Sequence, residues 1–391
     1  MGYVSVQGGT TAIENSRKLN RWQRLRGPSM PLSVQQIQDQ LGPLVDRVMG
    51  EGSLYSPFHA ALALKQASGD PIEASFLLRA YRSTLHRLTD SLPIRTDRMR
   101  ILRRISSAFK TIPGGQVLGS TSDYEQRILD FSLAEETEAA RDEAERDLVA
   151  AAVPQVEAGG GHETAPTASA GANGRAAAAS MQPERFRKVV DLLREQRLVA
   201  SLPAAARAST TAVGEPTDIT QHSAELPLDR SGRLQMLARA ETGGVLALAY
   251  SSMRGYGSVH PTIAELRVGY VQVRIPHPFR PGQTVALGSI KVTEVEIVAS
   301  IQRAQADGAP ALTLGYGACF GHNEVKAISM AVLDRTMKSE APGAPAEDQE
   351  FVLLHTDGIE SSGFCSHFKL PHYVTFQADL DRLRDLRGGE E

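Results

Sequence analysis

The sequence is poor in cysteine, in net charge and in long apolar runs, and each shortage excludes a class of protein. Among its 391 residues only Cys319 and Cys365 are cysteines, too few for a disulfide framework or a four-cysteine iron–sulfur cluster. The net charge of −3 provides no overall attraction to nucleic acid or to an anionic membrane. No apolar run approaches the roughly 18 residues that a membrane-spanning helix requires. We therefore expect a cytoplasmic protein that binds neither nucleic acid nor membrane.

Aromatic side chains are also scarce, at 5% of the residues, and one long internal segment lacks them. Between Phe131 and Ser180, sixteen of fifty residues are alanine and five are glycine. Such a segment buries too little apolar surface to offset the entropy lost on ordering. We predict a low-complexity insertion or linker over residues 134–225, partly helical and then disordered. Within it, residues 182–198 have the spacing of one amphipathic helix.

The rest of the chain, with 41% apolar residues overall, can form a core on each side of the insertion. Residues 1–133 are predicted to be a mainly helical N-terminal section. Thr11-Ala-Ile-Glu14 matches a capping box, Ser33-Val-Gln-Gln36 is expected to begin the next helix, and Asp70-Pro71-Ile72-Glu73 carries an N-cap, a first-turn proline and a glutamate in the expected order. Another helix is expected at residues 57–67.

A basic segment, residues 95–110, carries apolar side chains at helical spacing, which predicts a basic helix. It leads into Ile112-Pro-Gly-Gly-Gln116. Two interpretations of Gly114, Gly115 and Gln116 are open. Their backbone N–H groups, together with the arginines, could hold a polyphosphate. Alternatively, the glycines only end the helix.

Residues 226–391 alternate between strand and helix patterns, which predicts an α+β C-terminal section. Strands are expected at residues 266–275, 285–299, 311–317 and 351–355, and helices at residues 323–337 and 374–386. Two Gly-Tyr-Gly tripeptides, at residues 255–257 and 315–317, are expected to form turns that present a tyrosine. The predicted fold class is α+β: a helical section, then a largely antiparallel sheet with flanking helices, interrupted by the Ala-rich insertion.

His367 and His372 are five residues apart, so their side chains converge only if the chain turns between them. Pro371 favours such a turn. Two imidazoles on a turn are suitable ligands for Zn²⁺, which takes three or four protein ligands. The remaining ligands would have to come from elsewhere in the chain, from a partner or from substrate. The alternative is a loop with two incidental histidines.

Nine short stretches of the sequence, taken in order, match one protein family. They lie at residues 3–9, 45–49, 62–70, 76–82, 112–116, 246–251, 254–257, 315–317 and 366–377, and the last contains Ser-His-x-Lys-Leu-Pro-His. Each is weak alone, but together they span most of residues 3–131 and 228–380. On this basis the chain resembles subunit I of the phosphonate carbon–phosphorus lyase core complex. The insertion departs from the family, which we expect to be shorter there.

The resemblance implies a catalytic subunit of α-D-ribose 1-methylphosphonate 5-triphosphate synthase. Such a subunit displaces adenine from MgATP with methylphosphonate, and alone it is similar to a purine nucleosidase. Its partners are the other core subunits, G, H and J, of which J carries the iron–sulfur radical chemistry. The family's metal-binding histidine pair corresponds to His367 and His372, near the boundary with subunit J, so a shared Zn²⁺ is implied. A non-catalytic scaffold that contributes zinc ligands at that interface is the alternative.

This reaction sets requirements for the site. Loss of adenine develops positive charge on the ribose, so a carboxylate and a proton donor for the base are expected, but the sequence singles out neither. The triphosphate needs Mg²⁺ and cationic or N–H donors, for which Gly114, Gly115 and Gln116 are candidates. Gly255, Tyr256 and Gly257 are further candidates, with the tyrosine stacking on base or ribose. Structural turns are the alternative for both segments.

Overall fold

The computed structural model describes residues 9–152, 187–199, 216–254, 260–303, 309–339, 342–370 and 372–388. Its contacts divide the chain into two units. The larger unit comprises Met1–Leu118 and Glu184–Glu391, and the smaller unit comprises Gly119–Pro183. The described part of the smaller unit contains a short 3₁₀ helix, Phe131–Glu135, and α6 (Glu138–Ala152), and none of its described side chains is buried. The predicted disordered stretch after α6 lies outside the described residues.

Helix α1 (Gly9–Leu25) comes first in the described part of the larger unit; it has no buried residue, and Thr11 of the predicted capping box lies inside it. Helices α2 to α5 follow and pack around a core of their own. The helices span Val34–Gln40 (α2), Gly42–Gly52 (α3), Pro57–Gln66 (α4) and Pro71–Arg82 (α5). Two of their starts are those that the sequence predicts. Ser33 and Gln36 form a complete capping box, and the Asp70 carboxylate accepts hydrogen bonds from the first turn of α5. The core between the helices contains Ile37, Val45, Val48, Met49, Leu64 and Leu78.

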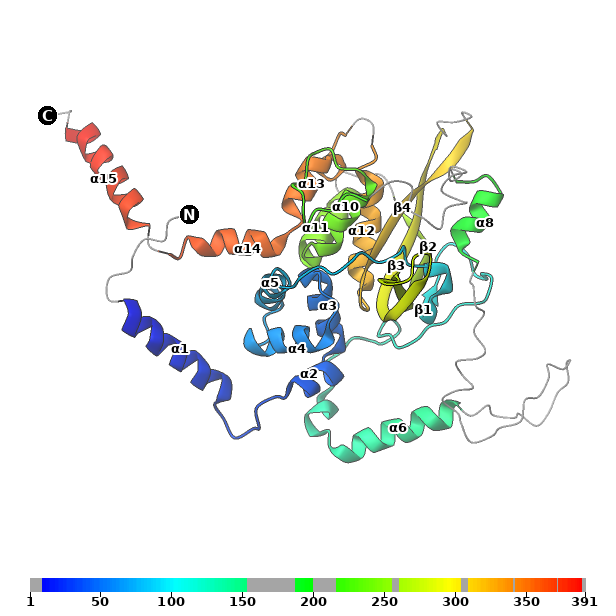
Figure 1. Ribbon diagram of the computed structural model, residues 1–391, viewed down its shortest axis with the longest axis horizontal. Helices are drawn as coiled ribbons and strands as arrows, with labels where there is room; N and C mark the ends of the chain where they lie inside the picture. The colour runs from blue at the N-terminus through cyan, green and yellow to red at the C-terminus, as the bar shows by residue number, and fades with distance from the viewer. Residues whose placement is uncertain are drawn as a thin grey trace, which may run out of the picture. The chain divides into compact units, whose positions relative to one another are not determined.

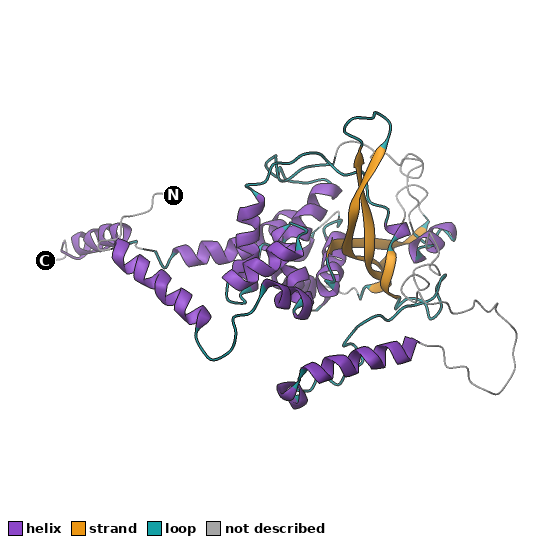
Figure 2. Cartoon of the chain, turned by 60° about the horizontal axis from the view of Figure 1, so that its bottom comes forward, coloured by secondary structure: helices purple, strands orange, loops and turns teal. Residues whose placement is uncertain are grey.

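One antiparallel sheet follows, in the strand order β1-β2-β3-β4. Its strands are β1 (Arg100–Ile105), β2 (Thr262–Pro276), β3 (Thr284–Arg303) and β4 (Pro310–Phe320). Figure 2 shows these strands together as one sheet with helices around it. The predicted α+β class, with helices first and a largely antiparallel sheet second, is confirmed.

The prediction of a basic helix at residues 95–110 is wrong. The segment contains one 3₁₀ turn, Thr96–Arg98, and then β1, which pairs with β2. Arg104 lies opposite Arg267 in this pairing, and Ile105 lies opposite Leu266. The apolar spacing fits a helix, but a strand partner more than 150 residues away in the sequence decides the outcome.

Helices cover both faces of the sheet (Figure 1). α10 (Arg230–Arg239), α11 (Thr242–Met253) and α12 (Glu324–Thr336) lie on one face. The core on that side contains Leu266, Val268, Val295, Ile297, Met330 and Leu333. α8 (Val189–Glu195) packs on the other face, where a second core contains Ile112, Val189, Val190, Leu193, Ala264 and Val298. Of the helix predicted at residues 182–198, residues 182–186 lie outside the described ranges; in the described part the helix spans Val189–Glu195, and it packs against the sheet.

The second Gly-Tyr-Gly tripeptide is not a turn. Gly315 and Gly317 lie inside β4, and α12 crosses directly against them. A Cβ atom at Gly315 would lie 2.0 Å from the Ala331 carbonyl oxygen, and one at Gly317 would lie 2.1 Å from the Ala327 carbonyl oxygen. The glycines therefore allow the close approach of helix and strand.

The chain continues as helices beyond α12. α13 (Gln349–His355) occupies the segment predicted to be a buried strand, so that prediction is wrong. The Asp348 carboxylate caps α13 by accepting from the Phe351 N–H at 3.0 Å. α14 (Gly358–His367) and α15 (Tyr373–Gly388) follow, and α15 is close to the helix predicted at residues 374–386. In the described part of the chain, no helix combines the length and the hydropathy needed to cross a membrane.

Candidate functional site

A groove of about 510 Å³ lies between α5, α10 and α14. Its walls are mostly apolar, and His367 lies at its edge. The lining residues are Phe76, Arg79, Ala80, Arg239, Ile359, Glu360, Gly363, Phe364 and His367. A groove of this size is within the range that holds a nucleotide-sized ligand.

Two arginines give the groove a polar, positively charged side. The Arg79 guanidinium pairs with Asp357 at 2.7 Å and also donates to the backbone carbonyl of Glu51 at 2.8 Å. Arg239 pairs with the exposed Glu360 at 2.8 Å. Arg82 lies one turn further along α5. Burial lowers the pKa of its guanidinium, and the charges of Arg239 and Arg79 lower it further. Three guanidinium groups thus lie near two carboxylates, Asp357 and Glu360, and the excess positive charge favours an anionic ligand.

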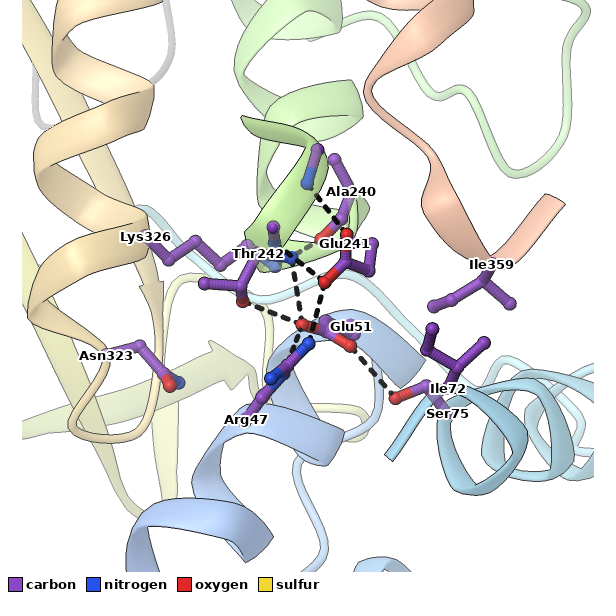
Figure 3. Close-up of polar contacts among 12 residues, drawn as sticks. Arg47, Glu51, Ile72, Ser75, Ala240, Glu241, Thr242, Asn323, Lys326 and Ile359 are labelled. Carbon is purple, nitrogen blue, oxygen red and sulfur yellow. Dashed lines mark hydrogen bonds and ion pairs between the residues drawn. The ribbon is translucent and has the colours of Figure 1, made fainter. Parts of the chain in front are cut away.

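Glu51, on α3, anchors a network that joins this side of the groove to the rest of the fold (Figure 3). Its fully buried carboxylate accepts from the Thr242 N–H at 2.9 Å and the Thr242 hydroxyl at 2.7 Å, and from the Ser75 hydroxyl at 3.3 Å. Arg47 pairs with Glu51 at 2.9 Å and with Glu241, the cap of α11, at 2.6 Å. The network therefore fixes α3, α5 and α11 relative to one another.

Lys326, on α12, is fully buried beside this network (Figure 3). Its ammonium group donates to the Ala240 carbonyl oxygen, at the end of α10, at 2.8 Å. Burial lowers the pKa of Lys326. The lysine thus satisfies a terminal carbonyl of α10, which is a structural role.

The structure brings His367 and His372 together. Their ring centroids are 5.3 Å apart, at an angle of 60°. His367 ends α14, and His372 directly precedes α15, so the chain changes direction between them. The Nδ1 atom of each ring lies within hydrogen-bonding distance of a backbone carbonyl, that of Phe364 for His367 and that of Leu370 for His372. When Nδ1 donates to a carbonyl, Nε2 keeps its lone pair for a metal, as metal-binding histidines commonly do.

Two imidazoles do not complete a zinc site. Within the described ranges, no group of three or more His, Cys, Asp or Glu side chains is close enough to hold a metal ion. The pair is therefore half of a possible zinc ligand set, and the zinc assignment stays a prediction.

The loop at Gly114, Gly115 and Gln116 is held by internal contacts. Both glycines adopt positive φ angles, 80° and 76°. The Gln116 side chain accepts from the Ser106 N–H at 3.1 Å and donates to the Lys110 carbonyl at 3.0 Å. The nearby Arg104 is fully buried, where it pairs with Glu265 at 2.5 Å and donates to loop carbonyls. The arginine is thus engaged within the fold and does not extend toward a polyphosphate. Gly255, Tyr256 and Gly257 lie outside the described residues.

One cluster was missed by the sequence reasoning. β3 alternates buried apolar residues with the two carboxylates Glu294 and Glu296, which meet Lys188, Arg267 and Tyr316 on the face opposite α12. Acidic residues at every second position of an apolar strand are the signal that could have revealed it.

Comparison with known proteins identifies the family. Residues 2–390 match the family described as "Bacterial phosphonate metabolism protein (PhnI)". The "Putative C-P lyase subunit protein HtxH" of Stutzerimonas stutzeri is 49% identical over 391 residues, which cover 98% of this chain and 95% of that protein. The "Alpha-D-ribose 1-methylphosphonate 5-triphosphate synthase subunit PhnI" of Escherichia coli (strain K12) is 42% identical over 390 residues, 98% of each chain.

The protein of the same name from Rhizobium meliloti (strain 1021) is 40% identical over 393 residues, covering 98% of this chain and 95% of that protein. The resemblance inferred from the nine stretches is thereby confirmed. These matches extend over nearly the whole sequence, and the chain therefore belongs to the PhnI family of bacterial phosphonate metabolism proteins.

Proposed function

We propose that the chain is the ribosyl-transferring subunit of a carbon–phosphorus lyase complex. It displaces adenine from MgATP with methylphosphonate and yields α-D-ribose 1-methylphosphonate 5-triphosphate; alone, it acts as a purine nucleosidase. Family membership supports the pathway, because two relatives are named as subunits of the synthase that makes this compound. The observation that places the proposed reaction on this chain is the groove between α5, α10 and α14, with its arginines.

The groove suits the substrates in size and charge. The apolar wall formed by Phe76, Ile359 and Phe364 can cover a purine or ribose ring, since aromatic and aliphatic side chains commonly line such sites. Arg79 and Arg239 lie where a triphosphate or phosphonate oxygen would be attracted. Both guanidinium groups are already oriented by Asp357 and Glu360, so little side-chain entropy is lost when an anion binds.

The proposed step exchanges one bond at C1′ for another. A phosphonate oxygen forms a bond to C1′ while the bond from C1′ to the adenine nitrogen breaks, and the bonding electrons leave with adenine, which takes up a proton. Positive charge develops on the ribose during this exchange. The phosphate and phosphonate charges must therefore be held by cations, and water must be excluded to prevent simple hydrolysis.

The histidine pair belongs to a second part of the proposal. His367 and His372 would supply two Nε2 ligands to Zn²⁺, with the remaining ligands from a partner subunit, which we take to be subunit J. Bound zinc would hold the two chains together at this boundary. Subunits G and H complete the proposed assembly.

A specific observation favours the alternative, a scaffold that only lends zinc ligands and surface. α15 buries none of its side chains, and exposed apolar residues surround the histidines. They include Phe364, Phe368, Tyr373, Val374 and Phe376. Such a surface is typical of an interface with another subunit.

Adenine release tests the two functions against each other. The chain, purified alone and with co-expressed core subunits, is incubated with MgATP and methylphosphonate, and adenine and the ribose product are identified by chromatography and mass spectrometry. The proposed function predicts free adenine in both samples and the ribose 1-phosphonate product with the subunits present. Intact ATP in every combination would contradict it.

Histidine variants separate the two parts. His372→Ala, at a residue outside the groove lining, is expected to leave adenine release unchanged but to stop phosphonate breakdown by the complex and to remove its zinc. His367→Ala is likewise expected to stop phosphonate breakdown and to remove the zinc, and its adenine release reports what His367 contributes to the edge of the groove. His355→Ala is the matched control, because His355 is an exposed histidine near the end of a neighbouring helix. Full zinc content in both variants would contradict the metal assignment.

A further inference from the structure

The two longest strands continue beyond their neighbours as a two-stranded hairpin, which we call the β2–β3 extension and define as residues 272–289. β1 pairs with β2 as far as Tyr270, and β4 pairs with β3 as far as Val292, so neither strand runs along the extension. None of its side chains is buried, and Figure 2 shows its loop projecting beyond the helices. Isolated two-stranded hairpins are marginally stable in water, so a partner that covers the extension would stabilise it.

The loop at the end of the extension presents an aromatic ring. Phe279 is 87% exposed. The loop around it is held by a hydrogen bond from the His277 N–H to the Gln283 carbonyl at 2.8 Å, and by one from the Phe279 N–H to the His277 Nδ1 atom at 3.1 Å. Three prolines between residues 276 and 281 restrict its backbone further. The ring is therefore presented by an ordered loop, which lowers the entropy cost of binding a partner.

The extension is positively charged. It carries Arg274 and Arg280 and contains no acidic residue. Arg274 donates along the strands to the side chains of Thr284 and Gln272, whereas Arg280 is exposed next to Phe279 at the tip. A surface that fits this tip therefore needs an apolar pocket with acidic residues beside it.

A pocket of this kind lies on the same chain, between α11, the short 3₁₀ helix Pro345–Glu347 and α13. Its volume is about 220 Å³, and its lining residues are Leu248, Ser251, Ala344, Pro345, Ala346 and Phe351. The Ser251 hydroxyl donates to the Leu248 carbonyl at 2.7 Å, so the lining presents mainly apolar surface. An apolar cavity of roughly 150 Å³ can bind benzene, so this pocket has room for the ring of one phenylalanine.

Acidic residues stand beside the pocket. Three of the four residues between the lining residues Ala346 and Phe351 are acidic, and two of them, Asp348 and Glu350, are exposed. Residues 342–355 contain no lysine or arginine. The pocket therefore matches the tip of the extension in size, in apolar character and in the sign of its charge.

We propose that the β2–β3 extension docks on a second copy of this chain, with the Phe279 ring in the pocket between α11 and α13 and Arg280 beside Glu350. Phe279 is exposed in its own chain, so the pocket that it fills belongs to another molecule. Reciprocal exchange of two extensions closes a two-fold pair in which both tips are covered. The contact is independent of the proposed reaction, because neither the extension nor the pocket contributes to the groove between α5, α10 and α14.

Sedimentation velocity of the purified full chain, over a range of concentrations, tests this contact. The wild type is expected to dimerise, and Phe279→Ser is expected to weaken the dimer by about 10- to 100-fold because it removes the aromatic anchor. Ala344→Trp places a large side chain in the pocket and is expected to have the same effect. Phe131→Ser is the matched control, because Phe131 is 79% exposed and lies in the smaller unit. This variant is expected to dimerise like the wild type.

Exchanging the charges tests the pairing across the contact. Arg280→Glu and Glu350→Arg are each expected to weaken the dimer, with a larger effect at low salt. The double variant again places opposite charges on the two copies and is expected to recover most of the affinity. Far-UV circular dichroism of each variant establishes that the chain is folded, so that a weaker dimer reports the contact itself.

Three outcomes would overturn the proposal. The first is a wild type that stays monomeric up to its solubility limit, and the second is wild-type dimerisation of Phe279→Ser. The third is a dimer that depends on Phe279 but tolerates Ala344→Trp, which would reject the pocket as the docking site. A monomeric wild type whose Phe279→Ser variant no longer co-purifies with the other core subunits would assign the extension to one of those subunits instead.

Discussion

Two regions of the larger unit use their polar side chains in opposite ways. In the helical body around α3, α5 and α11, the carboxylate of Glu51 is fully buried and is held by Arg47, Ser75 and Thr242. In the C-terminal arm, which we define as residues 360–388, no described side chain is buried, and the histidines contact only local carbonyls and neighbouring rings. The polar groups of the body hold its helices together, whereas the polar and apolar groups of the arm stay exposed, where a partner can contact them.

The largest expected effect is on the buried network. Glu51→Ala leaves the buried Thr242 N–H and hydroxyl without their acceptor and removes one of the two carboxylates that pair with Arg47, so we expect the free energy of unfolding to fall by about 3–5 kcal/mol. Urea denaturation followed by circular dichroism measures it. Glu360→Ala is the control in the arm, because Glu360 forms a mostly exposed ion pair with Arg239 that contributes less than about 1 kcal/mol. Equal losses in the two variants would remove the distinction between body and arm.

Two glycine substitutions, one under α12 and one in the arm, are expected to give the next largest difference in stability. Gly317→Ala places a methyl group against the Ala327 carbonyl, and the resulting shift of α12 is expected to cost about 1–3 kcal/mol. Gly363→Ala, in α14, meets no atom within 4 Å and is expected to leave the stability unchanged or to raise it slightly. The two melting temperatures are compared by calorimetry. A Gly317→Ala variant as stable as the wild type would show that the contact between β4 and α12 adjusts freely.

Removal of the last helix is expected to leave stability almost unaffected. A chain that ends before Tyr373 loses no buried side chain, so its free energy of unfolding should change by less than about 0.5 kcal/mol. The same deletion removes the exposed apolar residues of α15 and is expected to abolish co-purification with the other core subunits. If the shortened chain unfolds more easily, α15 contributes to the fold after all.

The reactivity of the two cysteines is the smallest of the expected differences between body and arm. Burial raises the pKa of Cys319, in β4, to about 11, so this thiol stays protonated and inaccessible well above pH 8. Cys365, in the arm, is exposed. One thiol per native chain is therefore expected to react with a maleimide at pH 8, and two after unfolding, as counted by mass spectrometry. Cys365→Ser is expected to abolish the native reaction, and labelling of Cys319 in the native chain would show that β4 opens easily.

Local sequence signals were enough for several elements. Ser33 with Gln36, and Asp70 with the following turn, begin helices through hydrogen bonds that span two to four residues, and such contacts can be recognised in the sequence. Segments 95–110 and 351–355 were assigned incorrectly because apolar spacing in short runs fits both a helix and a strand. Pairing with β2 decides the first, and the Asp348 cap begins the helix in the second.

The residues of the candidate sites also differ in whether the sequence alone could reveal them. The histidine pair could be named in advance, because its members are five residues apart, and the structure brings their rings together. The roles of Glu51 and Glu296 could not be predicted, because their neighbours lie in distant segments of the chain. Thr242 is 191 residues from Glu51, and Lys188 is 108 residues from Glu296. No local pattern separates Glu51 from the other acidic residues of the chain, and the alternation along β3 marks Glu296 without indicating its partners.

The sequence by itself determined the capped helices, the α+β class, the family and the histidine pair, since each depends on neighbouring residues or on an ordered set of short motifs. Only the tertiary structure decided that Gly315 and Gly317 lie under α12, that the arginines of α5 and α10 share a groove, and that one oxygen of Glu296 has no donor among the described residues. The physical reason is that packing and burial depend on which distant segments meet. The free energy of a charged group is set by those neighbours and not by its position in the chain.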